Sequence, residues 1–348
     1  MKKLFKISLK LILFIVTIII LAFVYLTITD YKPDLEIQIS KNESPEILNK
    51  NTFDIITWNI GYAGLGEDMD FFYDGGTKVR TTKEKTLKNL QEITNFIQEK
   101  DFDFFILQEL DINAKRSYNI NELDTLKKYK KGNYFYAPNY RVKYVPVPLS
   151  EPMGNVEAGL VSISKTNAAS ATRYSFPGNY AWPKNLFMLD RCFLVNRHPV
   201  KNGKELLIIN THNSAFDDGS LKEQQLNILK EFIENEYKKG NYVIIGGDWN
   251  QNPPNLQNNK FGGYNDNTSF KLTSIDSDFF SKDWKFAFDD KYPSNRALTE
   301  TYKENKTPVT ILDFFLISPN IKILSIETYN KNFKNSDHNP VHLKFKIE

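Results

Sequence analysis

Short apolar runs bounded by turn-forming residues recur along most of the chain and constrain its fold more than any other feature. They are rich in β-branched and aromatic residues, a pattern that predicts strands. Eight runs are clear: Phe53–Trp58, Phe102–Gln108, Gly159–Ser164, Cys192–Val195, Leu206–Thr211, Tyr242–Ile245, Leu312–Ile317 and Val341–Ile347. Because a few long helices are expected between them, we predict two sheets packed face to face with helices outside.

Two segments carry the spacing of amphipathic helices instead. Lys85–Gln98 and Leu221–Tyr237 each place their leucine and isoleucine side chains on one face. The second segment begins with Ser220 and Glu223 at the spacing of a capping box, and we expect it to end at Gly240.

The N-terminal region contains a long uncharged stretch. Leu11–Thr29 is about as long as the roughly 20 residues that a bilayer-spanning helix requires. Lysines precede it and Asp30 follows it, so we expect a cytoplasmic N-terminus and an extracytoplasmic remainder. A cleaved signal peptide is the alternative, but the run exceeds the usual signal core of about 7–15 residues and no small-residue cleavage site follows. We therefore predict an uncleaved, single-pass membrane anchor.

The rest of the chain then divides in two. Residues 31–52 contain Pro33 and Pro45 among polar residues, which predicts a linker between the anchor, residues 1–30, and the folded part. Residues 53–348 hold all the expected strands and fit one large domain.

Composition narrows the function only slightly. With 41% apolar and 14% aromatic residues, the chain is not expected to be disordered. Four lysines in the first ten positions explain the net charge of +3, because without them 41 basic residues face 42 acidic ones. The remainder is nearly neutral, which gives no support to a strongly cationic nucleic-acid-binding face. The single cysteine, Cys192, excludes an internal disulfide.

Polar residues stand where several expected strands end. Asn59, Glu109 and His212 each follow such a run directly. Each has an ordinary explanation when taken alone: a turn former, a loop charge and a hydrogen-bonded histidine. A metal site or catalytic site at the strand ends is the alternative explanation.

Two further motifs are more specific. In Gly246–Asn250 the two glycines permit close backbone approach, and the aspartate and asparagine, two positions apart, share one side of an extended chain. In Ser336–Val341 the adjacent aspartate and histidine point different ways and can serve a metal and a phosphate separately. Asp313 lies in an apolar strand, where burial without a partner would be costly, and a histidine is a plausible partner. Carboxylate, amide and imidazole groups together indicate a metal-assisted phosphoester hydrolase.

In this order the motifs resemble the endonuclease/exonuclease/phosphatase superfamily. This group includes pancreatic-type deoxyribonucleases, abasic-site endonucleases, inositol polyphosphate phosphatases and bacterial sphingomyelinases. The resemblance covers residues 53–348 and rests on Trp58-Asn59, Gln108-Glu109, Asn210-Thr211-His212, Gly247-Asp248-Trp249-Asn250, Asp313-Phe314 and Ser336-Asp337-His338. It implies a four-layer α/β sandwich with the catalytic groups at one end of two packed sheets.

The resemblance also implies a divalent cation, Mg²⁺ with Mn²⁺ as a substitute. Glu109 would hold this cation, with Asn59 and Asp337 nearby.

The same resemblance assigns the catalytic roles. Asp248 and Asn250 would orient the attacking water and the phosphate. His338, steered by Asp313, would act as general base or bind a phosphoryl oxygen. His212 would stabilise the transition state or protonate the leaving oxygen. Histidine suits both tasks because it exchanges protons near neutral pH.

The sequence departs from the family pattern in places. Ile311 stands where many members carry a basic residue, and the phosphate-contacting tyrosine of some nucleases has no clear match. Glu157 is a candidate partner for His212. We expect Lys127–Lys131 to be a solvated loop and Tyr134–Tyr140 to be a strand and turn on the core, although the latter could also stack bases.

The leading function is a monomeric, membrane-anchored phosphodiesterase or phosphatase acting on a lipid headgroup or related substrate. An endonuclease or exonuclease acting on DNA or RNA is the main alternative, which a basic groove would favour. A non-catalytic binding module of the same fold is a third, and the presence of all expected catalytic groups argues against it.

Overall fold

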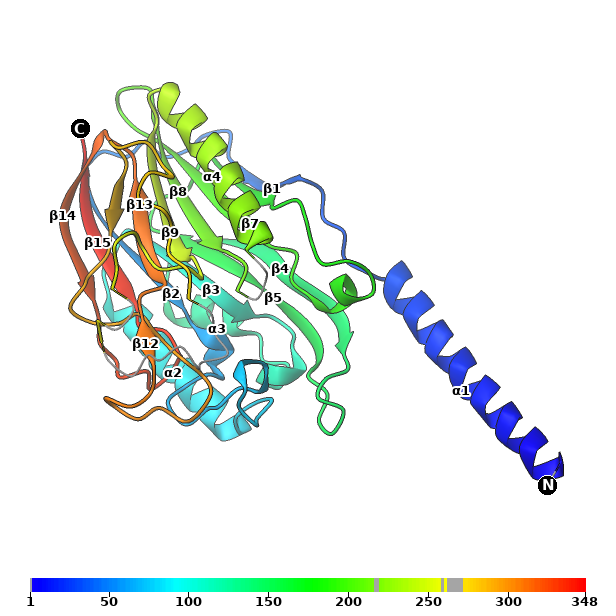
Figure 1. Cartoon of the computed structure of the whole chain (residues 1–348). Helices are drawn as coiled ribbons and strands as arrows, with labels where there is room; N and C mark the ends of the chain where they lie inside the picture. The colour runs from blue at the N-terminus through cyan, green and yellow to red at the C-terminus, as the bar shows by residue number, and fades with distance from the viewer. Residues whose placement is uncertain (1, 216–218, 258–259, 262–271) are drawn as a thin grey trace.

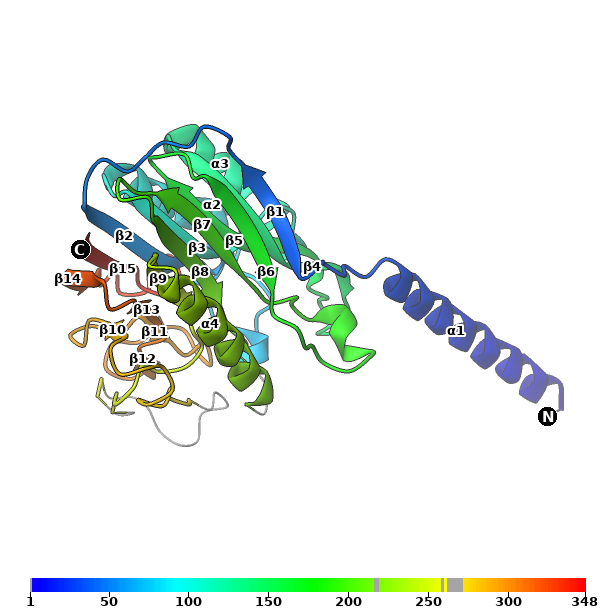
Figure 2. The same cartoon turned by 90° about the horizontal axis from the view of Figure 1, so that it is seen from above.

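Two β-sheets packed face to face form the body of the molecule in the computed structural model, which describes residues 2–215, 219–257, 260–261 and 272–348 (Figures 1 and 2). The first sheet has the strand order β1-β6-β7-β8-β9-β13-β10. Its strands are β1 (Glu36–Lys41), β6 (Ser170–Ser175), β7 (Cys192–Pro199), β8 (Glu205–His212), β9 (Tyr242–Asp248), β10 (Lys285–Ala287) and β13 (Asp313–Ile317).

The second sheet has the order β14-β15-β2-β3-β5-β4. Its strands are β2 (Thr52–Asn59), β3 (Phe104–Asp111), β4 (Asn133–Val145), β5 (Gly154–Ser164), β14 (Ile321–Thr328) and β15 (Val341–Ile347). A separate pair, β11 (Asn295–Arg296) and β12 (Val309–Thr310), lies near the mouth of the site.

Helices cover the outer face of each sheet. On the first sheet α4 (Ser220–Lys238) buries Leu226, Leu229 and Ile233. On the second sheet α2 (Lys83–Glu99) and α3 (Glu122–Tyr129) cover the opposite surface. Between the sheets, apolar side chains from both inner faces form one continuous core. This arrangement confirms the predicted four-layer α/β sandwich.

Strand direction gathers the polar strand ends at one edge. β2 and β3 are parallel, as are β8 and β9, so their carboxyl ends meet there. His212 pairs in register with Asp248, and Asp248 pairs with Asp313 at the start of antiparallel β13. The Ser336–Pro340 motif precedes β15 at the same edge, because Val341 pairs with Thr57 near the end of β2.

A buried amide pair joins the two sheets just below this edge. Gln108 Nε2 donates to Asn210 Oδ1 at 2.7 Å, and Asn210 Nδ2 donates to the carbonyls of Leu107 and Val161 at 3.0 and 3.1 Å. A fully satisfied polar contact in an apolar core fixes how the sheets sit on one another.

The predicted elements are found, with local differences. Each of the eight predicted runs coincides with a strand, although Phe102 and Leu312 lie just before β3 and β13, and both predicted helices form. The predicted capping box does not cap α4, because Gly219 at φ 104° occupies the N-cap position and Ser220 is already helical. The helix does end before Gly240, which has φ 85°.

Other segments are more regular than the sequence suggested. β1 lies within the predicted linker and pairs with β6. Lys127 and Lys128 belong to the last turn of α3 and not to a loop, a position that favours cations at a helix C-terminus. The aromatic stretch Tyr134–Tyr140 is part of the long strand β4.

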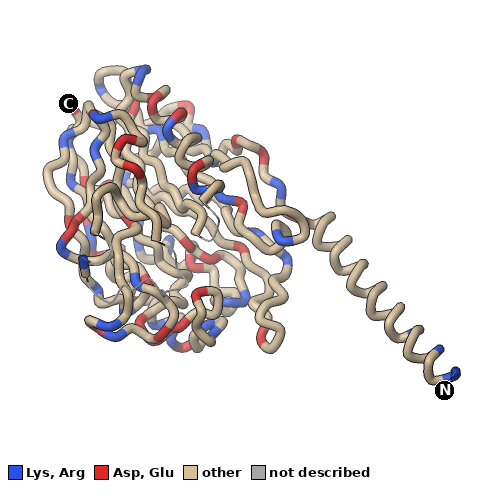
Figure 3. The backbone as a smooth tube through the Cα atoms, in the orientation of Figure 1, with Lys and Arg blue, Asp and Glu red and all other residues tan. Residues whose placement is uncertain are grey.

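The N-terminal helix α1 (Lys2–Ile28) projects away from the sandwich (Figure 1). It is long and apolar enough to span a membrane, and none of its residues is buried. Its charged residues, the four lysines, lie in its N-terminal part, whereas charges of both signs are interspersed over the domain (Figure 3).

Candidate active site

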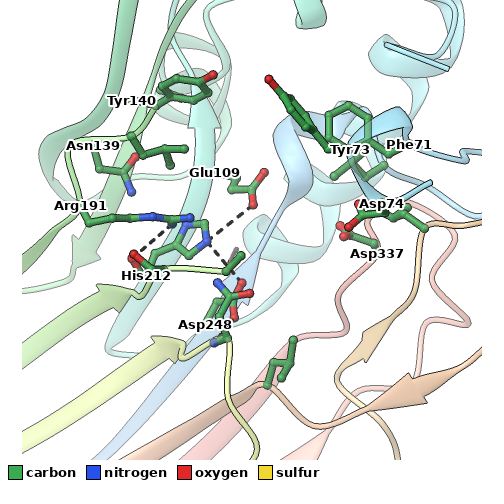
Figure 4. Close-up of a pocket in the computed structure, with 18 of the residues that line it drawn as sticks. Phe71, Tyr73, Asp74, Glu109, Asn139, Tyr140, Arg191, His212, Asp248 and Asp337 are labelled. Carbon is green, nitrogen blue, oxygen red and sulfur yellow. Dashed lines mark hydrogen bonds and ion pairs between the residues drawn. The ribbon is translucent and has the colours of Figure 1, made fainter. Parts of the chain in front are cut away.

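A cavity of about 190 Å³ opens at the edge where the polar strand ends meet. Its floor carries carboxylate and imidazole groups from both sheets, and its walls are largely apolar and aromatic (Figure 4). Six of the eight predicted site residues line it: Glu109, His212, Asp248, Asn250, Asp337 and His338. The other two contact lining residues, Asn59 through Glu109 and Asp313 through His338.

Glu109 is aimed into the cavity by a distortion of β3. The pairing of β3 with β5 shifts register between Leu107 and Leu110, and Glu109 adopts φ 52°. Such a left-handed conformation is costly for a residue with a side chain, and bulges re-aim side chains at functional sites. The prediction placed Glu109 after the strand, whereas it lies inside β3 at the irregularity.

Asn59 orients the acidic groups beside it. Its Nδ2 donates to Glu109 Oε1 at 3.1 Å and to Asp248 Oδ2 at 3.0 Å, while its Oδ1 accepts from Gly61 N at 3.0 Å. In this geometry the amide nitrogen, not a ligand oxygen, faces the carboxylates.

Asp248 occupies the centre of the floor. Its Oδ1 accepts from the backbone N–H of Asn250 at 2.9 Å, and Asn250 has φ 50°. The two residues therefore form a tight turn after β9 and do not share one side of an extended chain as predicted. The predicted close backbone approach is present, because a side chain at Gly247 would collide with the Thr211 carbonyl of β8.

His212 faces two carboxylates. Its Nε2 lies 3.5 Å from Asp248 Oδ2 and 3.8 Å from Glu109 Oε1 (Figure 4). Burial, together with the positive charges of Arg191 and His338, lowers the pKa of His212 well below its usual value. The imidazole is thus neutral near pH 7 in this environment.

His338 is held between partners on both ring nitrogens. Its Nδ1 lies 2.7 Å from Asp313 Oδ2, and the Asn295 amide nitrogen lies 3.0 Å from its Nε2. Burial alone would lower the pKa of His338, but the charges of Asp313, Asp337 and Asp248 outweigh burial and raise it well above the usual value. The histidine partner that the sequence indicated for Asp313 is therefore His338.

Several carboxylates crowd one side of the cavity. Asp74, in the short helix η2 (Phe72–Asp74), faces Asp337 in Figure 4. Burial and then the charges of Asp337 and Glu109 raise the pKa of Asp74 to about 7. Burial, reinforced by Glu109, also raises the pKa of Asp337.

These donors fit a hard divalent cation. Crowded, mutually repelling oxygen ligands are the set that Mg²⁺ binds and neutralises. A neighbouring group, Asp248, Asp313 and His338, also brings three ligand atoms within 4.8 Å of one another.

The sequence did not indicate most of the residues that form the wall of the cavity. Tyr62, Tyr73, Tyr140 and Arg191 line the cavity, as does Asn295. Most come from loops or short helices whose position depends on tertiary packing, and no local pattern marks them. Tyr140 ends the aromatic stretch that was noted in the sequence, so it alone had a signal.

The predicted pairing of Glu157 with His212 is absent. Glu157 lies 3.5 Å from Arg141 on the neighbouring strand β4. His212 Nδ1 is buried without a hydrogen-bond partner among the described residues.

A sandwich with histidines and a cluster of carboxylates that fits a divalent cation at one edge defines a metal-dependent hydrolase of phosphoester bonds. The chain belongs to the endonuclease/exonuclease/phosphatase family, whose model matches residues 56–338. No curated protein sequence matches the chain significantly.

Solved structures share this fold at low sequence identity. An endonuclease/exonuclease/phosphatase from Beutenbergia cavernae superimposes with a TM-score of 0.58 at 14% identity, covering 86% of this chain and 72% of that one. D. rerio TDP2, complexed with a single-strand DNA product, superimposes with a TM-score of 0.54 at 12% identity, covering 85% of this chain and 99% of that one. ANGEL2, a 2′,3′-cyclic phosphatase, superimposes with a TM-score of 0.53 at 16% identity, covering 89% of this chain and 99% of that one.

Proposed function

We propose that this protein is a membrane-anchored, extracytoplasmic, Mg²⁺-dependent phosphoesterase that acts as a monomer on a lipid-headgroup or related substrate. The observation that carries the proposal is the convergence of His212, Asp248 and the Asp313–His338 pair on one cavity beside an acidic cluster.

Glu109 and Asp337 would hold the cation, with Asp74 as a third candidate oxygen donor. When bound, the cation supplies charge stabilisation to the phosphoryl oxygens. Asn59 supports this arrangement by fixing Glu109 and Asp248 through its amide nitrogen.

The chain's own residues carry the proton transfers. Asp248 orients a water for in-line attack on phosphorus and accepts its proton, and Asn250 keeps Asp248 in position. As the new P–O bond forms, the bond to the leaving oxygen breaks, and that oxygen takes a proton from solvent, to which Asp248 returns the proton that it accepted. His338, oriented by Asp313, contacts a phosphoryl oxygen, and His212 stabilises the transition state from the opposite side.

A nuclease is the second candidate, favoured by the aromatic side chains in the wall. Tyr73 is 41% exposed and lines the cavity with Phe71 and Tyr140, so a base could stack there. The single-strand DNA product bound by TDP2 is compatible with this alternative. The near-neutral charge balance of the chain beyond its first ten residues favours the lipid substrate instead.

Activity of the full-length protein in detergent tests the proposal directly. Hydrolysis of bis(p-nitrophenyl) phosphate should stop when EDTA is added and resume with Mg²⁺ or Mn²⁺. Undiminished hydrolysis in metal-free buffer would contradict the mechanism. Parallel assays with single-stranded DNA, sphingomyelin and phosphoinositides would separate the two substrate classes.

The orientation needs its own test. Protease added outside an intact inner membrane should digest the domain that follows α1, because lysines precede the apolar stretch. Complete protection of that domain would place it in the cytoplasm.

A further inference from the structure

The C-terminal turns of α1 pack on one segment of the catalytic domain, residues 176–191. The Phe23 ring lies 5.8 Å from that of Trp182 and 6.4 Å from that of Phe187, measured between centroids. Trp182 Nε1 donates to Thr27 Oγ1 at 3.2 Å. The helix therefore has a defined contact with the domain beyond the covalent connection.

The other side of the same segment forms part of the cavity wall. Tyr180, Leu189 and Arg191 line the cavity. Tyr140, also in the wall, donates its hydroxyl to the Phe187 carbonyl at 3.0 Å. One short segment thus contacts the helix on one side and the candidate active site on the other.

Trp182 lies level with the C-terminal end of the uncharged stretch of α1, where a membrane-spanning helix would leave the bilayer. Thr27 lies near the C-terminal end of the uncharged stretch Leu11–Thr29, which would extend about 28 Å as a helix. Trp182 is 61% exposed. An exposed indole with a polar N–H favours the headgroup region of a bilayer.

A second apolar surface flanks the cavity on the side of α1. Figures 1 and 2 both show α1 leaving the domain beside β4, and Tyr31, just after the helix, lies 5.4 Å from the Arg141 guanidinium of β4. The connection from β4 to β5 exposes Leu149 at 87% and Val147 at 38%. This connection ends at Met153, which lines the cavity.

We propose that the 176–191 segment and the β4–β5 connection rest on the bilayer that holds α1. The cavity then opens at the membrane surface and takes phosphoesters carried by bilayer lipids. This inference rests on the proposed function, specifically on insertion of α1 and on phosphoester hydrolysis at the described site.

Tryptophan fluorescence tests the geometry without any activity measurement. Of the four tryptophans, Trp58, Trp249 and Trp284 are at most 6% exposed, so Trp182 is the one that lipids can reach. Full-length protein would be reconstituted in phosphatidylcholine–phosphatidylglycerol vesicles containing phosphatidylcholine with a shallow nitroxide. We expect strong quenching, and its loss in Trp182→Phe.

Activity tests whether this contact presents the substrate. Release of the phosphorylated headgroup from the same vesicles measures the reaction on lipid. Hydrolysis of bis(p-nitrophenyl) phosphate measures the reaction on a water-soluble substrate. Trp182→Ala and Leu149→Ser should each slow headgroup release about tenfold, because misplacing a substrate relative to fixed catalytic groups is costly. Both should leave the soluble reaction unchanged. Leu324→Ser is the matched control, since this exposed leucine lies on β14, far from α1 (Figure 1).

The outcomes separate the two proposals. Absence of quenching in vesicles with inserted protein would overturn the membrane contact, even if the soluble phosphodiester is hydrolysed. Equal slowing of both reactions would also overturn it, because the segment would then act only on the structure of the cavity. Faster cleavage of single-stranded DNA than of vesicle lipid would exclude the lipid substrate. Loss of EDTA-sensitive hydrolysis altogether would reject the proposed function, while quenching would still decide the geometry.

Discussion

Asp313 Oδ2 lies 2.7 Å from His338 Nδ1, and this contact joins the two sheets at the floor of the cavity. Asp313 begins β13 of the first sheet, and His338 precedes β15 of the second. The carboxylate orients the imidazole so that its Nε2 is directed toward Asp248, whose Oδ2 lies 3.7 Å away. The pair is thus one hydrogen-bonded unit supplied by two structural layers.

Asp313→Asn should lower kcat to nearly the same extent as His338→Ala. The amide keeps the shape of the carboxylate but removes the charge that orients the imidazole. Loss of a positioned donor to a phosphoryl oxygen typically costs about 10²–10³ in rate. Steady-state kinetics on a soluble phosphodiester would measure both variants.

The double variant decides whether the two residues act together. We expect it to be barely slower than either single variant, because residues that act as a unit are not additive. Multiplicative losses would mean that Asp313 does not work through His338.

Glu109→Gln should weaken binding of Mg²⁺ without removing the rest of the site. The substitution deletes one negative ligand charge and leaves a side chain of similar shape. Part of the lost rate should therefore return at high Mg²⁺ concentration, as measured by titrating the metal in the activity assay. A rate that no metal concentration restores would argue that Glu109 is not chiefly a ligand.

His212→Ala should reduce kcat at least about a hundredfold with little change in Tm, because we propose that its imidazole stabilises the transition state at the cavity floor. His342 provides a matched control. It is stacked on Phe102 at 4.3 Å between centroids and lies 2.8 Å from Asp54, away from the cavity. His342→Ala should keep the wild-type rate, and thermal melts of both variants would check folding.

Asn210→Ala should destabilise the sandwich by about 3 kcal/mol, because it leaves the Gln108 amide and two backbone carbonyls buried without their partner. Urea unfolding would measure the change. Thr52→Ala, at a hydrogen bond that is exposed, serves as a mild control and should change the free energy of unfolding by less than about 0.5 kcal/mol. Equal stability of the two variants would contradict a structural role for the amide pair.

Glu236, which lies away from the site, should make the stability of the fold depend on pH. It accepts hydrogen bonds from Arg197 at 2.8 and 3.0 Å and from Lys239 at 2.8 Å. Burial opposes ionisation, but these bonds lower the pKa of Glu236 to about 2. A carboxyl group whose pKa is lower in the folded state stabilises the fold at pH values above its unfolded-state pKa of about 4.3. That stabilisation is lost as the pH falls toward the folded-state pKa.

Glu236→Gln should therefore be less stable than the wild type at pH 7, and the difference should shrink between about pH 4.3 and the folded pKa. Comparing the two proteins at each pH cancels the titration of all other groups. A difference that stays constant with pH would refute the assignment.

The strands and the floor of the site could be predicted because local sequence determines them. Runs such as Tyr242–Ile245 are apolar on both faces, as burial between a sheet and a helix requires. Asn59 and His212 stand at strand ends, and parallel pairing then brings these ends together, close to Glu109 inside β3. Asp313 was identified by the cost of burying a carboxylate alone.

The remaining elements depend on contacts that no short segment encodes. β1 is a half-exposed edge strand that forms only against β6, so its sequence reads as polar. The conformation of Glu109 arises from a register shift with β5. Asp74 and Tyr73 reach the cavity because Arg296 donates to the carbonyls of Gly66 and Met69 and holds the preceding loop.

The separation between strand-borne floor and loop-borne wall has an evolutionary consequence. The floor residues Asn59, Glu109, His212 and Asp248 are fixed by the pairing of β2, β3, β8 and β9, whereas wall side chains such as Tyr180 and Leu298 come from connections between strands. Connections tolerate insertion and exchange far better than paired strands. A lineage can therefore acquire a new substrate by remodelling the wall alone, while the paired strands keep the floor unchanged.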